Sequence, residues 1–330
     1  MIYYFYMFTT HIFLFLVSLS VIWFFSGLII EATHRVAQRF NQSSFTAAFF
    51  ILGFLTSISE ISVAINSTIN KTPQVSAGNI VGASFLVILF IIPLLAIVGN
   101  KIHLKNTLNE AQLLIALIII ALPTFFLLDG AITVDEGLAC LIMYAVLPYS
   151  IHKVSSMTSK KVVQEVEQEL MHTKHTTDLD IIKILLAGGC IFIAGYILVE
   201  EVVFFAEIFK VPSSIIGLLI LSIGTNIPEI TVAIRAILKS KSDIAFGNYL
   251  GSATANTLIF GFLAIANGPF TIHSSGFKLT AILIVIGFTL LFFFAKSKNV
   301  LSKKEASVLI SIYIAFFIIQ AVSLFMLVNN

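Results

Sequence analysis

Charged residues are scarce in this sequence. Of its 330 residues, 58% are hydrophobic and only 11% are charged. A soluble domain of this length needs a charged surface, which this chain cannot supply. A lipid bilayer removes that need, because side chains that face lipid must be apolar. The composition therefore predicts a polytopic membrane protein whose main partner is the lipid bilayer, and the net charge of +2 gives no reason to expect nucleic acid binding.

Cysteine is also scarce. Cys140 and Cys190 are the only two, and both lie in apolar runs. They are too few and too far apart for a disulfide framework or a metal motif, so we expect buried free thiols. The first residues lack a basic segment and a small-residue cleavage site, which favours a retained first helix over a signal peptide. The sequence also lacks a nucleophile–base pair and a phosphate-binding loop, so we expect neither an enzyme nor a cofactor.

Apolar runs long enough to cross the hydrocarbon core recur along the whole chain. They predict ten helices, near residues 10–32, 44–69, 75–99, 109–129, 134–152, 181–206, 212–238, 243–268, 276–295 and 305–328. The only sizeable polar segment, residues 153–180, separates two halves of five helices each, residues 1–152 and 181–330.

The basic residues are unevenly distributed between the two sides of these helices. Sixteen Lys and Arg residues fall in, or beside, the loops after the odd-numbered helices, and three, Lys71, Lys210 and Lys278, fall on the other side. Short loops rich in Lys and Arg stay in the cytoplasm. We therefore expect an integral protein of the cell membrane with both termini outside and the 153–180 linker in the cytoplasm.

Two stretches of the chain match one another without a gap. Residues 56–82 and 225–251 align at a constant offset of 169, with ten identities in 27 positions that include paired Thr, Glu, Asn and Gly residues. The copies lie five helices apart, and because five is odd they must cross the membrane in opposite directions. The expected fold is an all-α membrane protein with ten transmembrane helices in two inverted-topology five-helix repeats.

The repeated motifs place carboxylates inside apolar helices. Thr56 and Glu60 are four residues apart, so they share a helix face. Thr225 and Glu229 repeat this spacing in the second copy. Antiparallel packing can bring the two faces together at mid-membrane, as an oxygen-rich pocket of the kind that Ca²⁺ selects. When that ion leaves, two nearby carboxylates cannot both stay ionised cheaply, so another cation or a proton must replace it. This requirement predicts an antiporter.

The copies also share a glycine–asparagine motif, GNIVG from residue 78 and GNYLG from residue 247. Its small residues allow close helix packing. Asn79 and Asn248 either bond across helices or contact the ion directly.

In these motifs the chain resembles the sodium/calcium exchanger branch of the calcium:cation antiporter superfamily. The second copy, GTNIPE followed by DIAFGNYLGSATAN, matches the alpha-repeat pattern of that family. The first copy, LTSISE followed by VSAGNIVGASFLV, is degenerate. The resemblance places alpha repeats at about residues 53–87 and 222–256.

The resemblance also implies a set of metal ligands. The central calcium site would use the threonine and glutamate of each repeat, and all four are present. Flanking sodium sites would complete the set with Gly53, Ser57, Ser222, Asn226, Ser252 and Asn256. In the first repeat, however, Ala83 and Val87 stand where the family has a serine and an amide or acid, so two oxygens are missing. Ser84 could replace one of them, and Asn226, where the family often has serine, could restore another.

We therefore expect exchange of Ca²⁺ for Na⁺ or H⁺ by alternating access, with fewer sodium ions than is usual in the family or with protons instead. A monomer is compatible with the sequence. Two alternatives stay open: an exchanger of another divalent cation, Mg²⁺ or Mn²⁺, and a decayed membrane scaffold without transport. Ala83 and Val87 favour the scaffold slightly, whereas the two intact pairs of threonine and glutamate oppose it.

Overall fold

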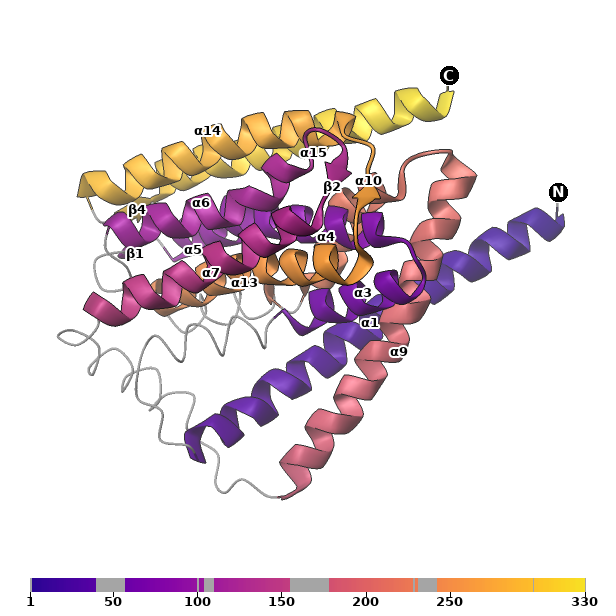
Figure 1. The fold of residues 1–330 in the computed structure, drawn as a ribbon, viewed down its shortest axis with the longest axis horizontal. Coiled ribbons are helices and arrows are strands. Elements are labelled where there is room, and N and C mark those ends of the chain that lie inside the picture. Colours follow the sequence, from indigo (N-terminus) through magenta and orange to yellow (C-terminus); the bar gives the residue numbers. More distant parts are fainter. Residues whose placement is uncertain are drawn as a thin grey trace.

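The computed structural model describes residues 2–39, 57–99, 101–103, 110–154, 178–227, 229–230, 242–298 and 300–329. This part of the chain is almost entirely helical (Figure 1). Its α-helices are α1 (Ile2–Arg39), α3 (Ile58–Ile69), α4 (Pro73–Leu86), α5 (Ile92–Val98), α6 (Glu110–Phe126), α7 (Val134–Val154), α9 (Asp178–Phe209), α10 (Ser213–Ile216), α11 (Ser222–Thr225), α13 (Ser242–Asn267), α14 (Ser275–Lys298) and α15 (Lys303–Asn329). Each of the ten predicted spans overlaps at least one of them.

Two of these helical segments contain a π-helical turn. The turn η1 (Val87–Ile91) joins α4 to α5, and η2 (Gly217–Leu221) joins α10 to α11. Such turns interrupt the regular hydrogen-bond ladder and occur often at functional sites. The turn η2 ends directly before Ser222, one of the predicted ligands.

Six helical segments in the described part of the chain are long and apolar enough to cross a membrane. They are Tyr6–Leu28, Pro73–Val98, Leu185–Phe209, Tyr249–Asn267, Phe277–Lys296 and Lys303–Ser323. Two further apolar helices, Glu110–Phe126 and Ser213–Thr225, are shorter. The observed architecture is thus an all-helical membrane fold. Several helices, such as α1 and α9, extend beyond the predicted apolar spans, because backbone hydrogen bonds can continue after the apolar side chains end.

Four short strands, which the sequence did not predict, connect the two halves. The strand β1 (Lys101–His103) pairs antiparallel with β4 (Val300–Ser302), and β2 (Ala131–Ile132) pairs with β3 (Phe270–Thr271). Strands of two or three residues are too short to show an alternating pattern. When the repeat offset of 169 is added to their residue numbers, the positions of β1 overlap those of β3, and the positions of β2 lie within β4. The two small sheets therefore follow the same internal relation as the repeated motifs.

The buried core has two parts. The larger cluster gathers side chains from α4 to α7 and from α13 to α15, including Phe85 and Phe260. The smaller cluster lies mainly between α1 and α9, around Ile22 and Leu198. In Figure 1, α1 and α9 cross at one side of the bundle, and α14 and α15 lie at the opposite side. Both cysteines are free thiols, as predicted, although Cys190 is only half-buried.

The helix α4 packs directly against the segment from α10 to α11 through small residues. A Cβ atom on Gly78 would collide with the main-chain oxygen of Ser214, and one on Gly82 with that of Leu218. From the other side, Gly217 approaches a main-chain oxygen of α4 equally closely. Such contact between backbones is possible only without side chains. The packing role predicted for the glycines of the first copy is confirmed, and this contact brings the two repeats together.

Candidate ion-binding site

The two glutamates of the repeated motifs are both buried. Glu60 lies in the first turn of α3 and is 2% exposed, and Glu229 lies four residues after α11 and is 1% exposed. The hydroxyl of Ser59 lies 3.1 Å from the main-chain oxygen of Thr225, so the two motifs are in direct contact. The fold thus combines two acidic side chains from distant parts of the sequence in one buried region.

Glu60 has a neutral hydrogen-bond donor beside each carboxylate oxygen. The side-chain nitrogen of Asn226 donates to Oε1 at 3.1 Å. The hydroxyl of Ser59 lies 2.9 Å from Oε2, and because it has one proton it donates either to this oxygen or to the Thr225 carbonyl. Sequence reasoning missed Ser59. Alignment of the copies could have found it, because Ser59 matches Pro228 and the hydroxyl therefore exists in the first copy alone.

Glu229 is surrounded differently. Neither of its carboxylate oxygens accepts a hydrogen bond from the residues that the structure describes. Its main-chain oxygen accepts a hydrogen bond of 2.9 Å from the hydroxyl of Tyr249, which fixes the backbone at this point. A buried carboxylate without a donor is unfavourable unless a cation or a proton neutralises it. The two glutamates, equivalent in the sequence, thus have unequal surroundings.

The second-repeat threonine connects the site to α4. The hydroxyl of Thr225 donates to Oδ1 of Asn79 at 3.1 Å, and both residues are fully buried. Of the two roles considered for Asn79, the structure shows the bond across helices. The side-chain nitrogen of Asn79 has no hydrogen-bond partner in the described part of the chain.

The predicted ligands Ser222 and Asn226 lie next to Glu60. The side-chain nitrogen of Asn226 donates to the main-chain oxygen of Ser222 at 2.8 Å and lies 3.4 Å from the hydroxyl of Thr225. In the structure it is the nitrogen of Asn226, rather than the oxygen expected from the resemblance, that faces these groups. The neighbouring oxygens are all hydrogen-bond acceptors, which explains the orientation.

Two further contacts join residues of opposite repeats. The hydroxyls of Ser57 and Ser252 lie 3.2 Å apart, and both side chains are buried. The amide nitrogen of Asn256 donates to the hydroxyl of Ser84 at 3.1 Å, while its Oδ1 has no hydrogen-bond partner among the described residues. Ser84 therefore does present a hydroxyl to a predicted ligand of the second repeat.

The two substituted positions of the first repeat offer no polar side chain. Ala83 and Val87 are fully buried, and Val87 belongs to the larger apolar cluster. Thr56 and Gly53 lie outside the described residues.

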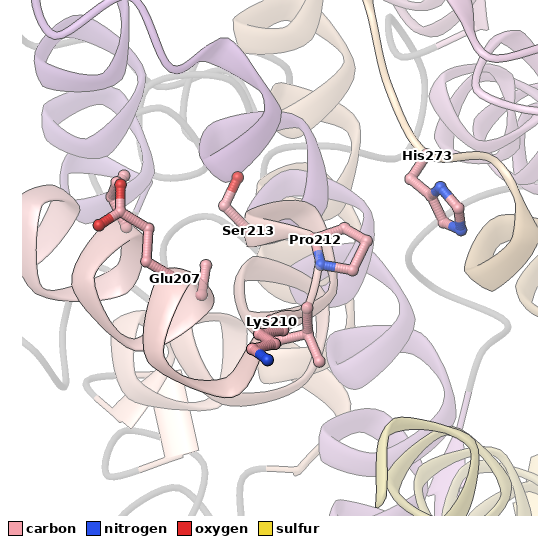
Figure 2. Close-up of a pocket in the computed structure, with 8 residues that line it drawn as sticks. Glu207, Lys210, Pro212, Ser213 and His273 are labelled. Carbon is pink, nitrogen blue, oxygen red and sulfur yellow. The ribbon is translucent and has the colours of Figure 1, made fainter. Parts of the chain in front are cut away.

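A pocket of about 520 Å³ lies elsewhere, where α9 ends and α10 begins. Figure 2 shows its polar lining of Glu207, Lys210, Ser213 and His273. None of the predicted ligands lines this pocket. Within the described ranges there is also no group of three or more His, Cys, Asp and Glu residues that could hold a metal ion. The buried glutamates with their hydroxyl and amide neighbours are therefore the stronger candidate for an ion site.

The chain is similar to known cation exchangers. A family model described as sodium/calcium exchanger protein matches residues 10–150 and 180–322. The sodium/calcium exchanger MaX1 of Methanosarcina acetivorans is 32% identical over 141 residues, which span 42% of this chain and 40% of that protein.

Two kinds of solved exchanger share the fold. The sodium-calcium exchanger NCX_Mj superposes with a TM-score of 0.61 and 21% identity, over 93% of this chain and 97% of that one. The H⁺/Ca²⁺ exchanger CAX superposes with a TM-score of 0.70 and 16% identity, over 97% and 87% of the two chains.

Proposed function

Since this chain belongs to the sodium/calcium exchanger protein family, we propose that it exchanges Ca²⁺ for Na⁺ or H⁺ at the buried pair Glu60 and Glu229. It is a membrane cation exchanger and not an enzyme. The observation that carries the proposed site is the burial of two carboxylates, one from each of two motifs in direct contact, of which Glu229 has no donor in the described part of the chain.

The chemistry of the site suits a divalent cation. Two carboxylates supply two negative charges, and the hydroxyl of Thr225 supplies a neutral oxygen beside them. By the repeat relation, Thr56 would supply a second hydroxyl. Ca²⁺ prefers six to eight oxygen ligands, which carboxylates, hydroxyls and main-chain carbonyls can provide together. When Ca²⁺ leaves, the repulsion between Glu60 and Glu229 favours entry of another cation, and this linkage is the physical basis of exchange.

The proposed topology has ten transmembrane helices in two inverted halves, residues 1–152 and 181–330, with the linker 153–180 in the cytoplasm and both termini outside the cell. The offset shared by the two small sheets supports the repeat. The N-terminus of α1 and the C-terminus of α15 lie on the same side of the bundle (Figure 1). This placement supports an even number of spans. Labelling of engineered cysteines should place residue 160 and the C-terminus on opposite sides; labelling from the same side would contradict the topology.

We propose that Ca²⁺ exchange is coupled to fewer Na⁺ ions than is usual in the family, or to protons instead. The burial of Ala83 and Val87, neither of which can bind a cation through its side chain, supports a loss of sodium ligands in the first repeat. The contact between Ser57 and Ser252 supports retention of hydroxyl ligands elsewhere.

The decisive experiment is uptake of ⁴⁵Ca²⁺ into proteoliposomes under sodium and proton gradients imposed separately. Uptake driven by either gradient, and lost in Glu229→Gln, is expected. Absence of uptake under both gradients would identify a scaffold without transport. Stronger inhibition by Mg²⁺ or Mn²⁺ than by unlabelled Ca²⁺ would assign a different divalent substrate.

A further inference from the structure

The side-chain nitrogen of Asn226 is surrounded by oxygens. It lies 2.8 Å from the main-chain oxygen of Ser222, 3.1 Å from Oε1 of Glu60 and 3.4 Å from the hydroxyl oxygen of Thr225. The Asn226 side chain is 1% exposed, so the described chain surrounds it almost completely. A carboxylate, a carbonyl and a hydroxyl oxygen in this arrangement are the kinds of ligand that hard cations select.

The amide nitrogen can donate hydrogen bonds to these oxygens, so they do not require a metal ion. Its two protons point to two acceptors, and the two shortest contacts, to Ser222 and Glu60, use both. The third contact, to the Thr225 hydroxyl, is the longest. The opposite orientation of the amide would set Oδ1 against the same carboxylate and carbonyl oxygens, which repel it. The observed orientation is therefore the one that these neighbours favour.

The equivalent position in the other repeat has a different chemistry. Ser57 aligns with Asn226 at the repeat offset, and its hydroxyl lies 3.2 Å from that of Ser252. The residue that aligns with Ser252 is Ala83. One flanking position thus has two hydroxyls, each with an oxygen that can bind a cation. The other has an amide nitrogen and a methyl group in their place.

These two substitutions are complementary. Ala83 removes a hydroxyl oxygen beside α11, where its neighbour Gly82 lies against the side chain of Ser222. Asn226 adds a hydrogen-bond donor where the aligned residue is a serine. A position that loses an oxygen and gains a donor no longer needs a cation to satisfy Glu60.

We propose that the side-chain amide of Asn226 replaces one monovalent cation beside Glu60, so that the ion exchanged for Ca²⁺ binds only on the side of Glu229, Ser57 and Ser252. This inference rests on the proposed exchange function. It makes Asn226 a residue that sets the coupling stoichiometry, through a hydrogen bond that is part of the protein and does not move across the membrane.

The test is displacement of ⁴⁵Ca²⁺ by Na⁺ from the purified full-length chain at equilibrium. The double variant Asn226→Ser with Ala83→Ser places one hydroxyl beside Glu60 and a second at the position that aligns with Ser252. It should bind one more Na⁺, so its Hill coefficient for sodium should exceed that of the wild type by up to about one. If the wild type shows no displacement by sodium, the double variant should acquire it.

The reverse pair of substitutions tests the same proposal in the other repeat. Ser57→Asn with Ser252→Ala moves the amide and the methyl group to the side of Glu229, and should remove a sodium ion from the wild-type number. This second pair keeps the test decisive if the first does not fold, as judged by gel filtration. Asn66→Ser is the matched control, because Asn66 is a buried amide that donates to the main-chain oxygens of Ser62 and Phe192. The control should leave the sodium dependence unchanged.

The outcomes separate this inference from the proposed function. Absence of ⁴⁵Ca²⁺ binding and exchange in the wild type would overturn the proposed function itself. Intact Ca²⁺ binding with the same Hill coefficient for sodium in the wild type and in the folded double variants would overturn only the role of Asn226. An Asn226→Asp variant that binds Na⁺ more tightly with no change in the number of ions would show that residue 226 is a sodium ligand, which also contradicts the proposal.

Discussion

The two repeats keep the same glutamate and surround it with different neighbours. Glu60 has a donor for each carboxylate oxygen, Ser59 and Asn226, whereas Glu229 has none in the part of the chain that the structure describes. The difference arises at aligned positions: Ser59 matches Pro228, and Asn226 matches Ser57. Matching positions in the two sequence repeats therefore do not require equal roles for the paired residues. One carboxylate has donors from the protein, and in our proposal the other depends on the transported ion.

The largest expected effect comes from removal of either charge. Glu60→Gln and Glu229→Gln should each lower Ca²⁺ affinity by about 100-fold or more, which corresponds to about 2.7 kcal/mol, because an amide keeps the volume but loses the charge that binds Ca²⁺. The measurement is ⁴⁵Ca²⁺ exchange and equilibrium binding. Near wild-type binding in either variant would show that the ion lies elsewhere.

The same two variants should differ in stability in the absence of Ca²⁺. Glu229→Gln removes a buried charge without a protein donor, so its thermal unfolding temperature in detergent should rise. Glu60→Gln replaces a carboxylate that has two neighbouring donors by an amide whose single oxygen can accept from only one side, so its unfolding temperature should lie below that of Glu229→Gln. Shifts of the same sign and size in both variants would contradict the asymmetry between the repeats.

Restoring the missing ligands of the first repeat should have a smaller effect. Ala83→Ser with Val87→Asn adds a hydroxyl and an amide where the family provides oxygens, and should increase the sodium dependence of ⁴⁵Ca²⁺ flux. The ratio of flux under sodium and pH gradients measures this change. If the unmodified protein already couples to sodium with the stoichiometry usual in the family, other groups replace the lost oxygens and our interpretation of these two residues is wrong.

The smallest effect is expected at Ser59. Ser59→Ala removes one neutral donor to Glu60 and should change Ca²⁺ affinity by about three- to tenfold, since such a hydrogen bond contributes about 0.5–1.5 kcal/mol. Ser62→Ala is the matched control on the same helix, because its hydroxyl donates to the main-chain oxygen of Ile191 instead. An equal change in affinity in both variants would assign Ser59 a purely structural role.

The sequence allowed prediction of those features that depend on long patterns. Apolar runs located the helical segments, and the repeat predicted the contact between the two glutamate motifs. The orientation of Asn226 could not be predicted, because acceptors from two separate segments, at Glu60 and Ser222, decide which amide atom faces them. The strands β1 to β4 were missed for a different reason. Their pairing joins residues far apart in the chain, and each strand is too short to leave a periodic signal.

The most direct test of the paired-glutamate site is a crystal structure of the protein soaked in Sr²⁺, a divalent cation whose anomalous scattering identifies it. Our account predicts one strong anomalous peak between Glu60 and Glu229, with carboxylate oxygens of both at about 2.3–2.6 Å, the range expected for a calcium site. A peak that contacts only one of these glutamates, or that lies in the pocket between α9 and α10, would contradict it.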